Sequence, residues 1–173
     1  MKYASRIALF LVPTILGSIS LVRADDSTPN LAAQSDKSSY NFEATDGIGT
    51  SRAYQQELGA RLYKISSSNI FTAIDYSHYF GESHSVRDIN LVSAEGGYRF
   101  QTATNFELIP YVGLGGAFLN QTNHQGAVDH LLTSPGLKVD YPIGQLVLGL
   151  DNQYLTVPNH NAYSMAATFG IRL

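Results

Sequence analysis

The sequence predicts an all-β fold, an eight-stranded, antiparallel, up-and-down β-barrel. Apolar and polar residues alternate along most of the chain, and no apolar stripe at helical spacing is sustained for long. Turn-forming residues divide this pattern into eight segments, an even number that suits an up-and-down barrel. The connections are short at one end and long at the other, which favours a barrel over a β-sandwich.

The first two dozen residues have the layout of a secretory signal peptide. Lys2 and Arg6 form a basic start, an apolar run of about 15 residues follows, and small residues precede Asp25. We expect cleavage after Ala24. Because the apolar run is short for a membrane-spanning helix, export is the preferred interpretation, with an uncleaved anchor as the alternative.

The remaining chain is acidic and contains no cysteine. Residues 1–24 hold three basic residues and no acid, so their removal moves the net charge from -3 to -6. This acidity argues against nucleic acid as a partner, because phosphates require a basic face. The absence of cysteine excludes disulfides and thiol chemistry. We expect residues 25–37 to form a flexible leader and residues 38–173 to form the barrel domain.

The eight strands are bounded by clusters of Gly, Pro, Asn, Asp and Ser. They are predicted at about 38–46, 52–65, 69–80, 87–100, 106–119, 130–141, 145–156 and 161–173. Tight turns are expected at 66–68, 101–105 and 142–144, whereas 81–87 and 120–129 are longer and polar.

Alternation sorts the strand residues onto two faces. The apolar face includes Leu58, Leu62, Val112, Leu114, Leu146, Leu148, Leu150 and Phe169. The opposite face carries the charged residues Glu57, Arg61, Asp75, Glu95, Arg99, Lys138 and Asp151. It also carries glycines on strand after strand, at positions 59, 97, 113, 115, 136, 149 and 170.

The glycines indicate which face lies inside. A solvated outer face gains nothing from repeated glycine, which weakens a strand. A narrow bore, in contrast, needs small residues beside long charged ones, and eight strands enclose just enough room for side chains. We therefore predict a transmembrane barrel, with the charged face inside and the apolar face toward lipid. Lipid tolerates no open sheet edge, so the sheet must close.

The bore charges are expected to pair with one another in a single layer, because a low-dielectric interior penalises isolated charge. Arg61 and Lys138 are expected to be braced by the carboxylates of this layer, which belong to Glu57, Asp75, Glu95 and Asp151. Arg61 in particular is expected to be surrounded by Glu57, Asp75 and Glu95. We interpret this network as structural. An ion path or gate is the alternative.

The segment PYVGLGGAF, residues 110–118, resembles a strand of the small outer-membrane barrels of the OmpA and OmpX kind. AEGGYRF at 94–100, GLKVDYPI at 136–143 and the terminal GIRL resemble other strands of that family. The resemblance implies an eight-stranded outer-membrane β-barrel domain over roughly residues 38–173 and supports the architecture more than any activity.

Two chemical alternatives remain open. The five histidines, His78, His84, His124, His130 and His160, all lie toward the long loops, where several could converge on a metal. The run SHYFGESHS at 77–85 contains Ser, His and Glu, as the outer-membrane enzymes that modify lipid A do, but not their His-x-Ser-Asn run. We predict neither a metal site nor catalysis, and no cofactor.

The function predicted from the sequence is that of a non-enzymatic, monomeric barrel exported to the outer membrane of a Gram-negative bacterium. It is expected to be structural and surface-exposed, with extracellular loops for adhesion or defence. Its expected partners are outer-membrane lipid and lipopolysaccharide, the barrel assembly machinery, and a host or environmental ligand at the loops. The alternatives are a narrow porin-like channel and a lipid A-modifying enzyme.

Overall fold

The computed structural model describes residues 39–51, 54–81, 86–121, 127–158 and 161–173. The expected signal peptide and leader lie outside these ranges, so both stay predictions. Within the described ranges, no helix is long and apolar enough to cross a membrane.

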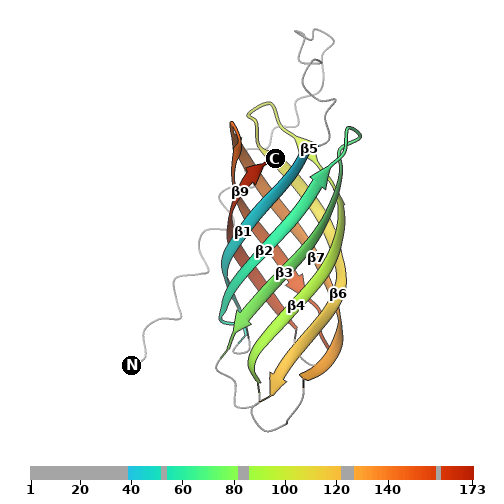
Figure 1. Cartoon of the computed structure of the whole chain (residues 1–173), viewed down its shortest axis with the longest axis vertical. Helices are drawn as coiled ribbons and strands as arrows, with labels where there is room; N and C mark the ends of the chain where they lie inside the picture. The colour runs from blue at the N-terminus through green and yellow to red at the C-terminus, as the bar shows by residue number, and fades with distance from the viewer. Residues whose placement is uncertain (1–38, 52–53, 82–85, 122–126, 159–160) are drawn as a thin grey trace, which may run out of the picture. The chain divides into compact units, whose positions relative to one another are not determined.

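The described residues form antiparallel strands arranged in chain order around a closed wall, and Figure 1 shows them inclined to the long axis of the barrel. The strands are β1 (Ser39–Gly49), β2 (Gln56–Ile65), β3 (Ile70–Phe80), β4 (Val86–Tyr98), β5 (Phe100–Gln101), β6 (Glu107–Gln121), β7 (Ala127–Ile143), β8 (Leu146–Leu155) and β9 (Ala162–Arg172). β1 pairs with β9 as well as with β2, which closes the sheet. Since β4 and β5 belong to one barrel strand, the wall has eight strands, and the predicted fold class is confirmed.

A proline explains why that strand is divided into β4 and β5. Gly97 pairs with Tyr111 and Phe100 pairs with Leu108, so both parts keep one register against β6. Between these pairs stands Pro110, which has no N–H to donate to the ladder. The strand is therefore divided because one hydrogen-bond donor is missing, and its direction does not change at this point.

The short connections define what we call the turn end of the barrel, and the opposite end is the loop end. Asn69 and Asn105 have φ values of 62° and 64°, and Gly144 has a φ of 63°. Asn and Gly adopt this left-handed conformation more readily than other residues, which suits them to tight turns. Asn105 and Gly144 lie within the turns predicted at 101–105 and 142–144, although β7 continues to Ile143, and Asn69 directly follows the turn predicted at 66–68. In contrast, β2 begins at Gln56 and not near residue 52.

Alternate residues of every strand point outward, and the outward face is apolar. Aromatic side chains gather toward both rims of this wall. Those toward the turn end are Tyr40, Phe42, Tyr98, Phe100, Phe106, Tyr141 and Phe169. Those toward the loop end are Tyr76, Phe80, Phe118, Tyr154 and Tyr163. Aliphatic residues such as Leu114 and Leu150 lie between the two groups.

The barrel interior is packed with side chains. Toward the turn end, an apolar cluster contains Tyr63, Ile65, Phe71, Ala73, Ile109 and Tyr111. A second one, which we call the loop-end cluster, contains Tyr54, Tyr79, Ile89, Leu91, Ala117, Leu119, Leu132, Leu155, Val157 and Ala162. Charged and polar side chains occupy the middle of the barrel between them.

Candidate functional site in the barrel interior

The charged residues predicted for the bore do lie inside the barrel. Six of the seven, Glu57, Arg61, Asp75, Glu95, Lys138 and Asp151, are at most 5% exposed, and Arg99 is half-buried at the turn end. They lie inside because, along each strand, they alternate with the apolar residues that point outward.

Arg61 is the centre of the largest ion-pair group. Its Nη1 donates a hydrogen bond to Asp151 at 2.5 Å, and its Nη2 donates one to Glu95 at 3.2 Å. Its Nε lies 3.3 Å from Asp75 Oδ1. The Tyr111 hydroxyl donates to Asp151 at 2.7 Å, and the guanidinium carbon lies 5.3 Å from the Tyr111 ring centroid. One planar cation thus joins carboxylates from three strands.

Two parts of the predicted network are wrong. Glu57 does not bind Arg61; instead it accepts hydrogen bonds from Ser77 at 2.9 Å and from Ser164 at 2.6 Å. Lys138 is not braced by the carboxylates around Arg61. Its Nζ donates to Glu43 at 2.8 Å and also contacts Asp140.

Arg99 is not part of the same layer either. It donates to Glu107 at 3.3 Å and to the side chain of Asn69 at 2.7 Å, beside a tight turn. Arg172 donates to the same Glu107 oxygen at 2.9 Å. The interior charges therefore form separate groups around Arg61, around Lys138 and around Glu107. Glu57 joins the Arg61 group indirectly, through the Ser77 hydroxyl, which lies 2.9 Å from Glu57 and 3.0 Å from Asp75.

Glu43 and Glu107 are interior acids that the sequence analysis missed. The signal for Glu43 was present, because Tyr40, Phe42 and Ala44 form an apolar row on alternate positions and leave Glu43 on the inner face. Glu107 likewise precedes Leu108, which belongs to the apolar row of its strand.

The inward glycines make room for these polar side chains. A Cβ added at Gly170 would contact the side chain of Glu43, and one added at Gly149 would contact Asp140 and Thr168. A Cβ at Gly136 would overlap the Tyr111 ring. The narrow bore thus needs glycine because large side chains on neighbouring strands occupy the space.

The eight residues predicted to face lipid all point outward. Their exposed fractions run from 42% for Leu146 to 58% for Leu114. Such an arrangement gives an apolar outer wall around an interior whose middle is polar, as in transmembrane barrels.

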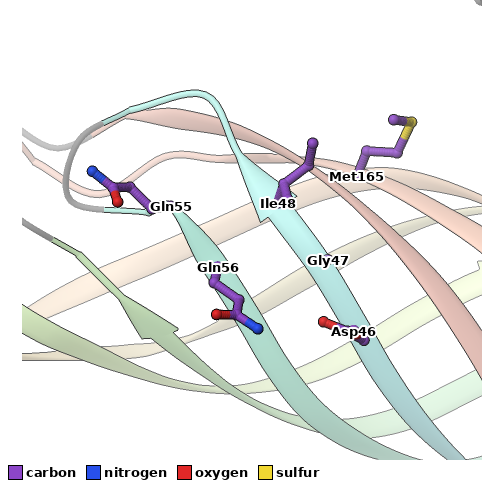
Figure 2. Close-up of a pocket in the computed structure, with 6 residues that line it drawn as sticks. All are labelled: Asp46, Gly47, Ile48, Gln55, Gln56 and Met165. Atoms are coloured by element: carbon purple, nitrogen blue, oxygen red, sulfur yellow. The ribbon is translucent and has the colours of Figure 1, made fainter. Parts of the chain in front are cut away.

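A shallow depression of about 500 Å³ lies on this outer wall near the loop end (Figure 2). It is lined by Asp46, Gly47, Ile48, Gln55, Gln56 and Met165. Figure 2 shows Ile48 of β1 and Met165 of β9 side by side. Asp46 is the only acidic residue that lines the depression. Since it is open and outside the bore, it gives no access to the interior charges.

The histidines do not converge in the described part of the chain. His78 lies on the outer face and its Nδ1 is 2.8 Å from Asn90 Oδ1, whereas His130 pairs in register with the inward Ala117. His84, His124 and His160 lie outside the described residues. No group of three His, Cys, Asp or Glu suited to a metal occurs among the described residues. Part of the run at 77–85 also lies outside them, so the arrangement of its Ser, His and Glu is untested.

The fold is shared with solved bacterial barrels. The N-terminal β-barrel domain of Pseudomonas aeruginosa OprF matches with a TM-score of 0.53 at 22% identity, covering 78% of this chain and 97% of that one. Ail, the attachment invasion locus protein of Yersinia pestis, matches at 0.54 and 15% identity, with 79% and 97% covered. Neisserial surface protein A matches at 0.53 and 17% identity, with 79% and 96% covered.

No protein-family model matches the chain, and no curated protein matches it by sequence. At identities of 14 to 22%, the structural likeness concerns the fold. It agrees with the family resemblance of the segment at 110–118. The chain therefore has the closed eight-stranded barrel fold of these bacterial proteins.

Proposed function

We propose that this chain is an integral, non-enzymatic barrel protein of the bacterial outer membrane. The observation that carries the proposal is the apolar outer wall, in which large side chains of every barrel strand are exposed. A wall of this kind would drive aggregation in water. Lipid accepts it when the backbone groups of the strands pair within a closed sheet, and the sheet of this barrel is closed.

The two aromatic rims give further support. Transmembrane barrels carry an apolar band about 25 Å tall between aromatic girdles at the two membrane interfaces. With the amino terminus in the periplasm, the turn end faces the periplasm and the loop end faces outward. The partners are then outer-membrane lipid with lipopolysaccharide, and the barrel assembly machinery during insertion. The sheet closes within one chain, which supports a monomer.

The interior supports a structural role for the bore. The Arg61 and Lys138 groups bind carboxylates from strands on different sides of the barrel and so hold the wall together. Because the side chains of Arg61 and Lys138 are at most 1% exposed, a substrate could not reach them without opening the barrel.

Surface recognition is the finer part of the proposal. The loops at the loop end would serve adhesion or defence. The likeness to Ail supports this, since that protein is named an attachment invasion locus protein and an outer membrane protein. The test is binding of expressing cells to host-cell monolayers, for the parent protein and for a variant that lacks residues 122–126. Equal binding of both strains and of cells without the protein would argue against adhesion.

A narrow channel is the second candidate, favoured by the charged middle of the bore. The apolar loop-end cluster opposes it, so we expect little or no conductance in planar bilayers and no passage of sugars. Large, stable currents from the purified protein would favour the channel instead.

The main experiment separates the membranes of cells that express the full chain. We expect the protein in the outer-membrane fraction, resistant to carbonate extraction, with an electrophoretic mobility that changes on boiling. The lipid A mass spectrum should match that of cells without the protein. Recovery from the soluble periplasm would contradict the membrane proposal, and a changed lipid A mass would contradict the non-enzymatic part.

A further inference from the structure

A row of three side chains that can donate hydrogen bonds lies on the outer wall near the turn end. Tyr40 of β1 pairs in register with Lys64 of β2, and Lys64 pairs with Thr72 of β3. Tyr40 and Thr72 are exposed and Lys64 is half-buried, and all three point away from the bore. The three strands are neighbours in the sheet and lie side by side in Figure 1. We call these three residues the polar row.

Lys64 differs from the cations of the interior because it has no counter-charge in the described part of the chain. Four interior cations each form an ion pair with a carboxylate, namely Arg61, Arg99, Lys138 and Arg172. Lys64 forms no ion pair with any residue that the structure describes. Its Nζ lies 5.1 Å from the centroid of the Tyr40 ring. A ring covers one side of an ammonium group and leaves N–H donors on the other sides, so Lys64 can still bind an anion.

The polar row borders an open depression of about 230 Å³ on the outer wall. Leu62 and Ile74 line this depression together with the polar row. They pair with each other, and each lies one outward position nearer to the middle of the barrel than Lys64 and Thr72. Both are exposed, at 47% and 63%. The depression therefore offers hydrogen-bond donors toward the turn end and apolar side chains toward the middle of the wall.

This arrangement of charge and apolar surface fits a phospholipid. In a membrane, the aromatic rim at the turn end lies at the interface where lipid head groups are found. A lysine near the end of a membrane-spanning segment extends its ammonium group toward those head groups. A phosphate group there carries the negative charge that Lys64 lacks and has several oxygens that accept hydrogen bonds. Basic sites at such positions attract anionic lipids.

We propose that the polar row binds the phosphate of an anionic glycerophospholipid. The phosphate accepts hydrogen bonds from Lys64 and Thr72 beside the Tyr40 ring, and the acyl chains run over Leu62 and Ile74 toward the middle of the wall. The membrane leaflet that supplies this lipid rests on the proposed function, whereas the site is a property of the folded chain.

Native mass spectrometry of the purified full chain, refolded in detergent micelles, tests this site. The lipid probes are phosphatidylglycerol and a diacylglycerol with the same acyl chains but without the phosphate. Lys64→Gln removes the positive charge, whereas Lys64→Arg keeps it. Thr72→Val removes a hydroxyl from the polar row. The matched control is Thr133→Val on the outer face of β7, which is not a neighbour of β1, β2 or β3. Folding of every variant is checked by the mobility change on boiling.

We expect the parent to bind phosphatidylglycerol about fivefold more tightly than the diacylglycerol, the effect of one basic residue at an anionic lipid surface. Lys64→Gln should lose this preference, and Lys64→Arg should keep it. Thr72→Val should reduce the preference, whereas Thr133→Val should bind as the parent does. Equal affinity of the parent for the two lipids would overturn the site, and so would an unchanged preference in Lys64→Gln.

Inorganic phosphate, added at the same concentration as phosphatidylglycerol, separates a lipid site from a site for free phosphate. We expect no displacement of the lipid, because its acyl chains also contact the wall. Displacement would overturn the assignment of a phospholipid as the ligand. The test is also distinct from that of the proposed function. A folded chain without lipid preference would refute the site alone, whereas recovery of the protein from the soluble periplasm would refute the membrane proposal.

Discussion

At the residue scale, the interior depends on single cations that gather carboxylates across the bore. Arg61 lies on β2 and Asp151 on β8, and these strands are not neighbours in the sheet. Lys138 of β7 likewise binds Glu43 of β1. Each such contact ties together parts of the wall that the backbone ladder does not join. Removal of one cation leaves several buried carboxylates without compensation.

Arg61→Ala should therefore destabilise the barrel by about 3 to 5 kcal/mol, the usual cost of breaking a buried ion pair. Lys64→Ala on the same strand is the control. Lys64 is only half-buried, and its Nζ lies over the Tyr40 ring, 5.1 Å from the centroid, so its loss should cost about 1 kcal/mol or less. Urea unfolding in lipid vesicles would compare the two, and similar losses would mean that Arg61 does not occupy a closed interior.

Glycine at position 149 should be needed for space. The added methyl group of Gly149→Ala would meet Asp140 and Thr168 in the Lys138 group, and overpacking of this kind costs about 1 to 3 kcal/mol. Gly96→Ala is the control, because a Cβ there meets nothing within 4 Å. The same unfolding measurement should show a loss only for Gly149→Ala. A loss for Gly96→Ala of the same size would point to backbone flexibility instead.

At the element scale, Tyr54, which lies between β1 and β2, helps to fill the loop end of the barrel from the inside. Its side chain is fully buried and packs against Tyr79 of β3. The Tyr54 hydroxyl makes no hydrogen bond to a described residue, whereas the Tyr79 hydroxyl accepts one from Gln153 at 3.1 Å. Tyr54 therefore contributes chiefly apolar packing.

This burial predicts a pH dependence. Desolvation raises the pKa of Tyr54 from 10.0 to about 12. Since the unfolded chain ionises first, the stability that the neutral phenol provides is complete below pH about 10 and is lost as the pH rises toward about 12. Tyr54→Phe should unfold with a smaller decrease in stability over this range. An unchanged pH dependence in urea unfolding of this variant would show that Tyr54 is solvated.

Alternation along the strands was sufficient to predict which residues form the outer wall. Side chains of a strand point alternately to its two faces, so the outward residues follow once the turns are known. The partners inside the bore could not be predicted in the same way. Which residues meet across the interior depends on the stagger between strands around the closed sheet, and this stagger is not visible in single segments. Alternation therefore placed Arg61 in one interior layer with Asp75, Glu95 and Asp151, but it could not show that Lys138 binds Glu43 instead. Glu43 was missed because the two faces of the first strand were not sorted.

At the scale of the whole molecule, the barrel carries most of its charged strand residues inside and presents large apolar side chains on its outer face. The exterior requires a surrounding that is apolar over the middle of the wall and polar at both rims. If lipid covers the outer face of the strands, the cost of placing a charge there depends on its depth in the membrane. Two outward residues of β8 allow this cost to be compared at two depths along one strand.

Leu150→Arg and Leu146→Arg provide that comparison by unfolding in lipid vesicles. Both side chains point outward, at 47% and 42% exposure, but Leu150 lies near the middle of β8 and Leu146 begins the strand beside a tight turn. We predict a loss of about 2 to 4 kcal/mol for Leu150→Arg and of about 1 kcal/mol or less for Leu146→Arg, because the cost of charge depends on membrane depth. If both variants were as stable as the parent, the outer wall would not face lipid.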